Sequence, residues 1–130
     1  MKKKLVISAQ NIFEGGPLII LKKLIEQLRY YDEKYDITIF IYNRKILKLN
    51  NISKKIKFIE IKKSRKSYFH RIYYEFFFLK KFSHKHKPDI WISMQDFLPN
   101  ISAKKKIVYF HTPIIFYNMN SKYISFKFIL

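Results

Sequence analysis

The feature that most constrains this chain is the alternation of short apolar runs with segments of helical spacing. Five runs are rich in β-branched and aromatic residues, as expected of strands: Lys4–Ala9, Asp36–Tyr42, Ile56–Ile61, Pro88–Met94 and Lys106–Phe110. Strands that alternate with helices in this way are typical of a parallel sheet with helices on both faces. We therefore predict an α/β fold: a Rossmann-like three-layer domain with a mainly parallel five-stranded sheet.

Two helices are expected to cover this sheet. The segment Pro17–Tyr31 has apolar residues at helical spacing on one face, namely Leu18, Leu21, Leu24, Ile25 and Leu28. The segment Ser67–Phe82 has an aromatic stripe that we interpret as core, namely Phe69, Ile72, Tyr73, Phe76 and Leu79. A membrane-bound helix is the alternative for this second segment, because it is also basic. In the common strand order 3-2-1-4-5, the first and fourth strands are neighbours, and ligands bind at the crevice between their carboxyl ends.

Both glycines of the chain, Gly15 and Gly16, lie side by side in the loop after the first strand. Pro17 fits the first helical turn, and Gly16 fits the cap before it. A helix that begins there directs free amides at the crevice, where they favour an anion. A tight turn without a ligand explains the pair equally well. The third glycine of GxGxxG and the GxxxxGK[ST] pattern are both lacking, so neither a dinucleotide fingerprint nor a P-loop is predicted.

Two further polar residues follow strands of the predicted sheet. Asp96 lies in the loop after the fourth strand and His111 directly after the fifth, so both open on the edge that holds the glycine pair. The alternatives are a turn-forming aspartate and a packed, hydrogen-bonded histidine. His84 and His86 have the spacing of metal ligands, but no carboxylate or cysteine accompanies them, and their position at a helix end explains them. We predict no metal site.

The chain is strongly basic, with 27 Lys and Arg against 9 Asp and Glu, a formal charge of +18. Such an excess favours nucleic acid or an anionic membrane surface, although the bias towards residues with AT-rich codons explains most of it. The absence of cysteine excludes disulfides and thiolate sites. The apolar stretch Leu5–Ala9 is too short for a signal peptide. We expect a cytoplasmic chain, or one peripheral at the inner membrane face.

Three pieces of the sequence, "EGGP", "PDIWISMQDFLPN" and "KKKIVYFHTPIIFY", together resemble the N-terminal half of retaining glycosyltransferases of the GT-B fold, family 4, over essentially the whole chain. The resemblance implies a nucleotide-sugar donor and a polysaccharide or lipid-linked acceptor. It implies that Gly15 and Gly16 lie near the donor phosphates, that His111 is catalytic at the transferred sugar, and that Asp96 lies on the acceptor side. It implies no metal or other cofactor.

The second domain of that family, which makes most contacts with the donor nucleotide, has no counterpart here. We therefore expect an N-terminal domain over residues 1–113, the start of a helical segment over residues 114–130, and no sugar transfer by this chain alone. A separate C-terminal half is then the expected partner, and whether the chain is an enzyme stays open. The alternatives are a non-catalytic remnant or partner subunit, and a basic nucleic-acid-binding module. We expect no nucleic-acid partner.

Overall fold

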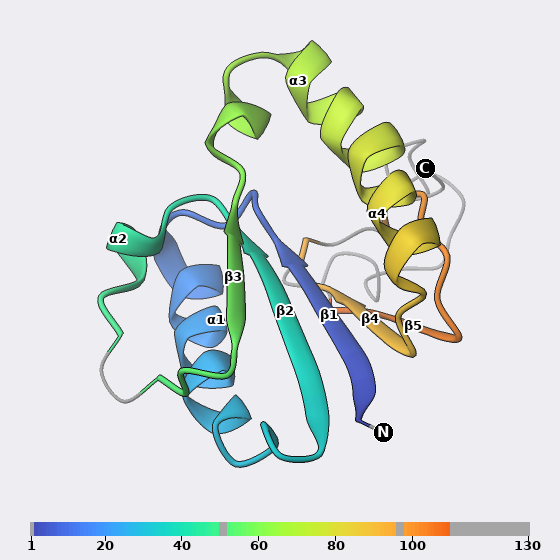
Figure 1. The fold of residues 1–130 in the computed structure, drawn as a ribbon. Coiled ribbons are helices and arrows are strands. Elements are labelled where there is room, and N and C mark those ends of the chain that lie inside the picture. The colour runs from blue at the N-terminus through green and yellow to red at the C-terminus, as the bar shows by residue number, and fades with distance from the viewer. Residues whose placement is uncertain (1, 50–51, 96–97, 110–130) are drawn as a thin grey trace, which may run out of the picture.

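The structure is a computed structural model that describes residues 2–49, 52–95 and 98–109. Its elements, in chain order (Figure 1), are β1 (Lys3–Ala9), α1 (Gly15–Leu28), β2 (Tyr35–Ile41), α2 (Arg44–Leu47), β3 (Lys57–Glu60), the 3₁₀ turn η1 (Lys62–Arg65), α3 (Tyr68–Ile72), the π-helical η2 (Tyr73–Phe78), α4 (Leu79–His86), β4 (Ile90–Ser93) and β5 (Lys105–Val108). All five predicted strands are present, with their ends shifted by at most two residues. Helix α1 begins two residues earlier and ends three residues earlier than predicted.

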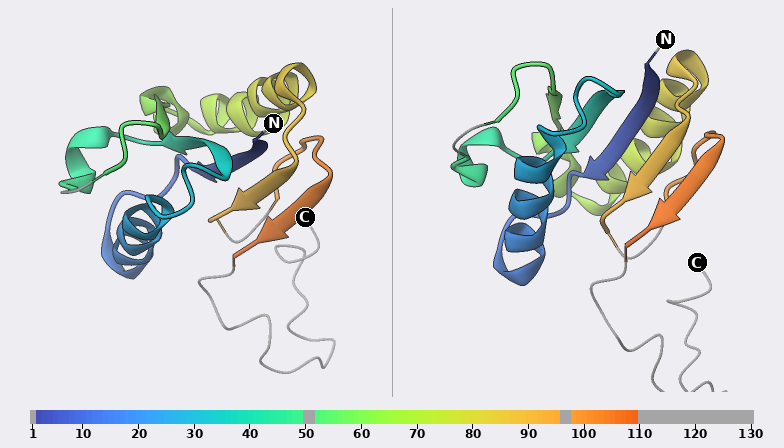
Figure 2. Two further views of the ribbon diagram at one scale, coloured as in Figure 1. Left: turned by 60° about the horizontal axis from the view of Figure 1, so that its bottom comes forward. Right: turned by 90° about the horizontal axis from the view of Figure 1, so that it is seen from below.

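The strands form one sheet in the order β3-β2-β1-β4-β5, and every pairing is parallel. This order places β1 in the centre of the sheet, makes β1 and β4 neighbours, and leaves β3 at an edge, as expected. Figure 2 shows α1 on one face of the sheet and the helical run α3–η2–α4 on the other. The predicted α/β class and the Rossmann-like three-layer architecture are confirmed. Because all strands run the same way, their carboxyl ends meet at one edge.

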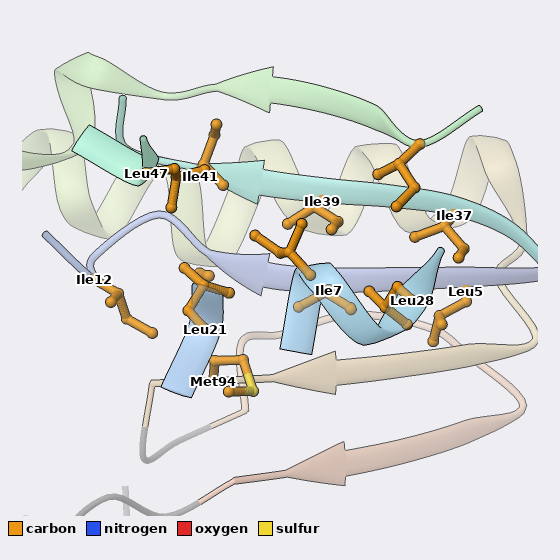
Figure 3. Packing of buried hydrophobic residues seen from close by; sticks show 13 residues of the cluster. Leu5, Ile7, Ile12, Leu21, Leu28, Ile37, Ile39, Ile41, Leu47 and Met94 are labelled. Carbon is orange, nitrogen blue, oxygen red and sulfur yellow. The ribbon is translucent and has the colours of Figure 1, made fainter. Parts of the chain in front are cut away.

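The core on the α1 face is aliphatic (Figure 3). Leu21, Ile25 and Leu28 of α1 are buried against the sheet, and Leu18 and Leu24 pack against them half-buried. The predicted apolar stripe of α1 is therefore confirmed. The strands contribute alternate residues to this cluster, as a pleated sheet requires: Leu5, Ile7 and Ala9 from β1, and Ile37, Ile39 and Ile41 from β2.

The core on the opposite face is aromatic. Phe40 of β2 lies at its centre, with ring centroids 4.9 Å from Phe82 and 6.0 Å from Trp91. The rings of Phe40 and Phe82 meet edge to face, a favourable arrangement for aromatic pairs. The indole Nε1 of Trp91 is buried and donates a hydrogen bond to Ser8 Oγ at 3.0 Å. The buried indole N–H is thereby satisfied, and the bond links β4 to β1.

The predicted core stripe of the second helix is wrong. Phe69, Tyr73 and Phe76 are exposed, and of the stripe only Leu79 is fully buried. The residues of the helical run that pack on the sheet are instead Tyr74, Phe78, Leu79 and Phe82. Aromatic residues fill almost every position from 73 to 78, so their spacing does not decide which side faces the sheet. The π-helical turn η2 also has more residues per turn than an α-helix, so the α-helical spacing behind the predicted stripe does not hold within it.

Candidate functional site

The loops that follow β1 and β4 are joined at the carboxyl edge of the sheet. The amide of Met94 donates a hydrogen bond to the carbonyl of Ser8 at 3.0 Å. This bond belongs to the end of the parallel β1–β4 ladder, where Ser8 pairs with Ser93. Beyond it, the amide of Asn11 donates to Gln95 Oε1 at 3.1 Å. The two walls of the predicted crevice are therefore held together by bonds between residues more than eighty positions apart.

A buried carboxylate in the helical run accepts a hydrogen bond from this junction. Glu75 lies in η2 and is only 5 % exposed. Its Oε1 accepts hydrogen bonds from Asn11 Nδ2 at 2.8 Å and from Arg71 Nε at 3.1 Å. Burial raises the pKa of Glu75, and the Arg71 guanidinium and the Asn11 amide oppose that rise. Asn11 thus links three segments: the loop after β1, the π-helical turn and the loop after β4.

Three amide atoms at the same edge are buried without a hydrogen-bond partner among the residues that the structure describes. Gln10, directly after β1, is fully buried, and within the described part of the chain neither its Nε2 nor its Oε1 has a hydrogen-bond partner. The Nε2 of Gln95, after β4, is in the same condition. An unpaired buried polar group costs about 1–3 kcal/mol, and native proteins seldom retain one without a water, an ion or a ligand to satisfy it. These atoms therefore have hydrogen-bonding capacity that the described residues do not use.

The start of α1 opens on the same loop, and its two glycines serve different purposes. Gly15 has φ +74°, a left-handed conformation that other residues adopt with strain. A Cβ at Gly16 would meet none of the described atoms within 4 Å, so nothing there requires glycine. The residue that caps α1 is Glu14, not Gly16 as predicted, and its side chain makes no capping bond. Both glycines are exposed and the first turn of α1 holds no acid, conditions that favour an anion beside its N-terminal amides.

The sequence-predicted site residues are only partly placed by the structure. Gly15 and Gly16 lie at the carboxyl edge, in the loop after the central strand, as expected. Asp96 and His111 lie outside the described residues, as does the predicted boundary between residues 113 and 114. Their roles stay predictions.

Sequence reasoning missed four residues of this edge: Gln10, Asn11, Glu75 and Gln95. A signal was present for the first two, because a polar pair directly follows the apolar run of the first strand. Glu75 is the one acid in the aromatic run "YYEFFF". A carboxylate that is buried among aromatic side chains needs a hydrogen-bond or ion-pair partner. Gln95 gave no signal beyond its position after the fourth strand.

Two cavities formed by the described residues lie away from this edge. One of about 400 Å³ opens at the amino ends of β1, β2 and β3, and its lining includes Lys4, Asp36 and His86. Burial, followed by the neighbouring lysines, lowers the pKa of His86, whose ring stacks on Phe82 at 4.2 Å. A second, of about 840 Å³, runs along η2 and α4. Among the residues that the structure describes, no three His, Cys, Asp or Glu side chains are grouped as a metal site would need.

In the described ranges, no helix has the length and apolar character needed to cross a membrane. Compared with models of protein families, with curated proteins and with solved structures, the chain shows no significant match. A functional assignment therefore rests on the geometry of the carboxyl edge and on the motif residues of the sequence.

Proposed function

We propose that this chain is the acceptor-side domain of a nucleotide-sugar-dependent glycosyltransferase that extends a polysaccharide or a lipid-linked acceptor. The observation that supports it most is that buried amide atoms of Gln10 and Gln95, just beyond the carboxyl ends of β1 and β4, have no hydrogen-bond partner within the described ranges. They lie at the crevice where open parallel sheets bind ligands. The motif resemblance supplies the class of ligand.

The chemistry of the edge suits a sugar joined to phosphate. A carboxamide both donates and accepts hydrogen bonds, and each sugar hydroxyl does the same, so the two pair in either direction. The open amides at the start of α1 favour a phosphate group. At Gly16 the lack of a side chain lets a ligand approach the backbone closely. The Asn11–Glu75 hydrogen bond fixes the loop that bears Gln10, which keeps the amide from rearranging.

The remaining roles extend this proposal. His111 contacts the transferred sugar, and Asp96 lines the acceptor side. A C-terminal half, whether on the same chain or a separate one, supplies most contacts with the nucleotide, so residues 1–130 by themselves bind weakly and do not turn over, since one wall cannot orient a donor or exclude water. The complex works in the cytoplasm, at the inner face of the membrane when its acceptor is lipid-linked.

The chain offers a direct test, because its only glutamines are Gln10, Gln27 and Gln95. Protein labelled with ¹⁵N at the glutamine side chains gives three pairs of amide resonances, and exposed Gln27 on α1 is an internal control. Titration with nucleoside diphosphate sugars at millimolar concentration should shift the Gln10 and Gln95 resonances and leave those of Gln27 in place. If a panel of sugar nucleotides and oligosaccharides moves neither buried pair, the proposal fails.

A further inference from the structure

The outer side of α3 and η2 presents large aromatic side chains to solvent. We call this set the aromatic face: Tyr68, Phe69, Tyr73, Phe76 and Phe77, which are 74, 81, 53, 45 and 62 % exposed. The rings of Tyr73 and Phe77 are stacked, with their centroids 6.3 Å apart, so these two members of the aromatic face lie side by side. Exposed apolar side chains that are grouped on a folded domain mark a site of interaction with a protein, a membrane or a ligand.

Basic side chains border the aromatic face at both ends of the helical run. Before it lie exposed Lys62, Lys63 and Lys66, and after it lie exposed Lys80, Lys81 and Lys85. The one acid between Ser67 and Lys87 is Glu75, which is buried on the opposite side and bonded to Arg71. Negative charge is therefore absent from the solvent-facing side of this described segment.

A groove joins the two kinds of side chain. The cavity of about 840 Å³ along η2 and α4 is lined by Tyr73 and Phe77 at one end and by Lys80, Lys81 and Lys85 at the other. Its chemistry is therefore amphiphilic, with aromatic carbon next to ammonium groups. Such a pairing suits a molecule that joins an anionic headgroup to an apolar chain.

We propose that the aromatic face docks on an anionic lipid surface. Its rings enter the boundary between headgroups and acyl chains, where Tyr and Phe are favoured, and the flanking lysines meet the lipid phosphates. A second copy of the chain fits less well, because each copy would bring the same lysines and the same formal charge of +18 to the contact. Nucleic acid fits less well too, because single strands use aromatics interleaved with cations that reach the phosphates, whereas the one Lys or Arg among these rings, Arg71, is bonded to Glu75. The inference does not depend on the proposed sugar transfer.

Vesicle co-sedimentation tests this assignment. The whole chain is mixed with vesicles of phosphatidylcholine alone, or of phosphatidylcholine with about a third phosphatidylglycerol. The anionic vesicles should bind it more tightly, and Lys80→Gln/Lys81→Gln should weaken that binding about twenty-fivefold, since each lysine near the surface contributes about fivefold. Phe69→Gln/Phe77→Gln should weaken it at least about tenfold, because apolar area leaves the interface.

Matched controls distinguish an effect of the aromatic face and its flanking lysines from an effect of total charge or total aromatic content. Lys23→Gln/Lys45→Gln removes the same charge from exposed positions on α1 and α2, and Tyr30→Gln/Tyr31→Gln removes two exposed rings near the far end of α1. Both should leave vesicle binding within about threefold. The proposal is overturned if the Lys23/Lys45 pair weakens binding as much as the Lys80/Lys81 pair, or if the Phe69/Phe77 pair has no effect. It is equally overturned if those two phenylalanines instead prove necessary for binding single-stranded nucleic acid or for dimerisation in the absence of lipid.

Discussion

Replacing Gln10 by methionine should make the free protein more stable while removing the sugar binding that we propose. The side chain is fully buried and, among the residues described, its amide nitrogen and oxygen are both unpaired. Methionine has nearly the same length and volume but no group that needs a hydrogen bond. The substitution therefore removes the desolvation cost of the amide without opening a cavity.

The size of the effect follows from two opposing quantities. Leaving a buried amide unpaired costs about 1–3 kcal/mol, and a volume-conserving replacement costs under about 1.5 kcal/mol in packing. We expect a net gain of about 1 kcal/mol in the free energy of unfolding. For a domain of 130 residues this corresponds to a rise of about 4 °C in Tm.

Urea and thermal unfolding followed by circular dichroism measure this change. Gln27→Met is the matched control, because Gln27 is exposed on α1 and should shift stability by no more than about 0.5 kcal/mol. In the same preparation, Gln10→Met should abolish the shift of the Gln95 amide by a nucleotide sugar. A loss of 1 kcal/mol or more in Gln10→Met would refute the reasoning, since it would show that the amide already has good partners in the free protein.

Three further outcomes are expected. Gly15→Ala should destabilise the fold by about 1–2 kcal/mol because of its positive φ, and thermal unfolding would show this loss. Gly16→Ala should leave the stability unchanged in the same assay and should weaken the proposed nucleotide-sugar binding in the amide titration. Burial raises the pKa of Glu75 above 4.5, so the stability of the wild type relative to Glu75→Gln should be greatest below about pH 4.5 and fall as the pH passes the raised pKa. Urea unfolding between pH 4 and 8 tests this, and a difference that does not vary with pH would contradict it. Ser8→Ala leaves the Trp91 Nε1–H without its acceptor and should cost about 1–3 kcal/mol in the same assay.

The sheet could be predicted from sequence because each strand carries its own local signal. Residues such as Ile7 and Ile39 lie in apolar runs short enough to be strands, and the helical spacing between the runs requires parallel crossovers. The stripe Leu21–Ile25–Leu28 identified the buried side of α1 for the same reason. The orientation of the second helix could not be predicted, because Tyr73 and Tyr74 are equally apolar and only the tertiary contacts of Phe78 and Phe82 decide which one faces inward.

The candidate site was harder to predict than the fold. Gln10 is of interest because its buried amide has no hydrogen-bond partner among the described residues. A missing partner can be recognised only when the neighbouring groups have been placed in three dimensions. The role of Asn11 depends on Glu75 and Gln95, which are 64 and 84 residues away along the chain. Gly15 and Gly16 were found early because a glycine pair is a local signal, although the division of their roles required the backbone angles.

The central position of β1 has a consequence for how the protein is made. Its first partner, β2, follows within about forty residues, but its second partner, β4, ends only at Ser93. At a synthesis rate of about 5–20 residues per second, the β4-facing edge of β1 stays unpaired for several seconds after β2 has emerged. During that interval an apolar strand has open backbone groups along one side, the condition under which nascent chains recruit chaperones or pair with each other. Translation speed between residues 42 and 93 therefore influences the yield of folded protein, because β1 gains its second neighbour only after Ser93 has left the ribosome.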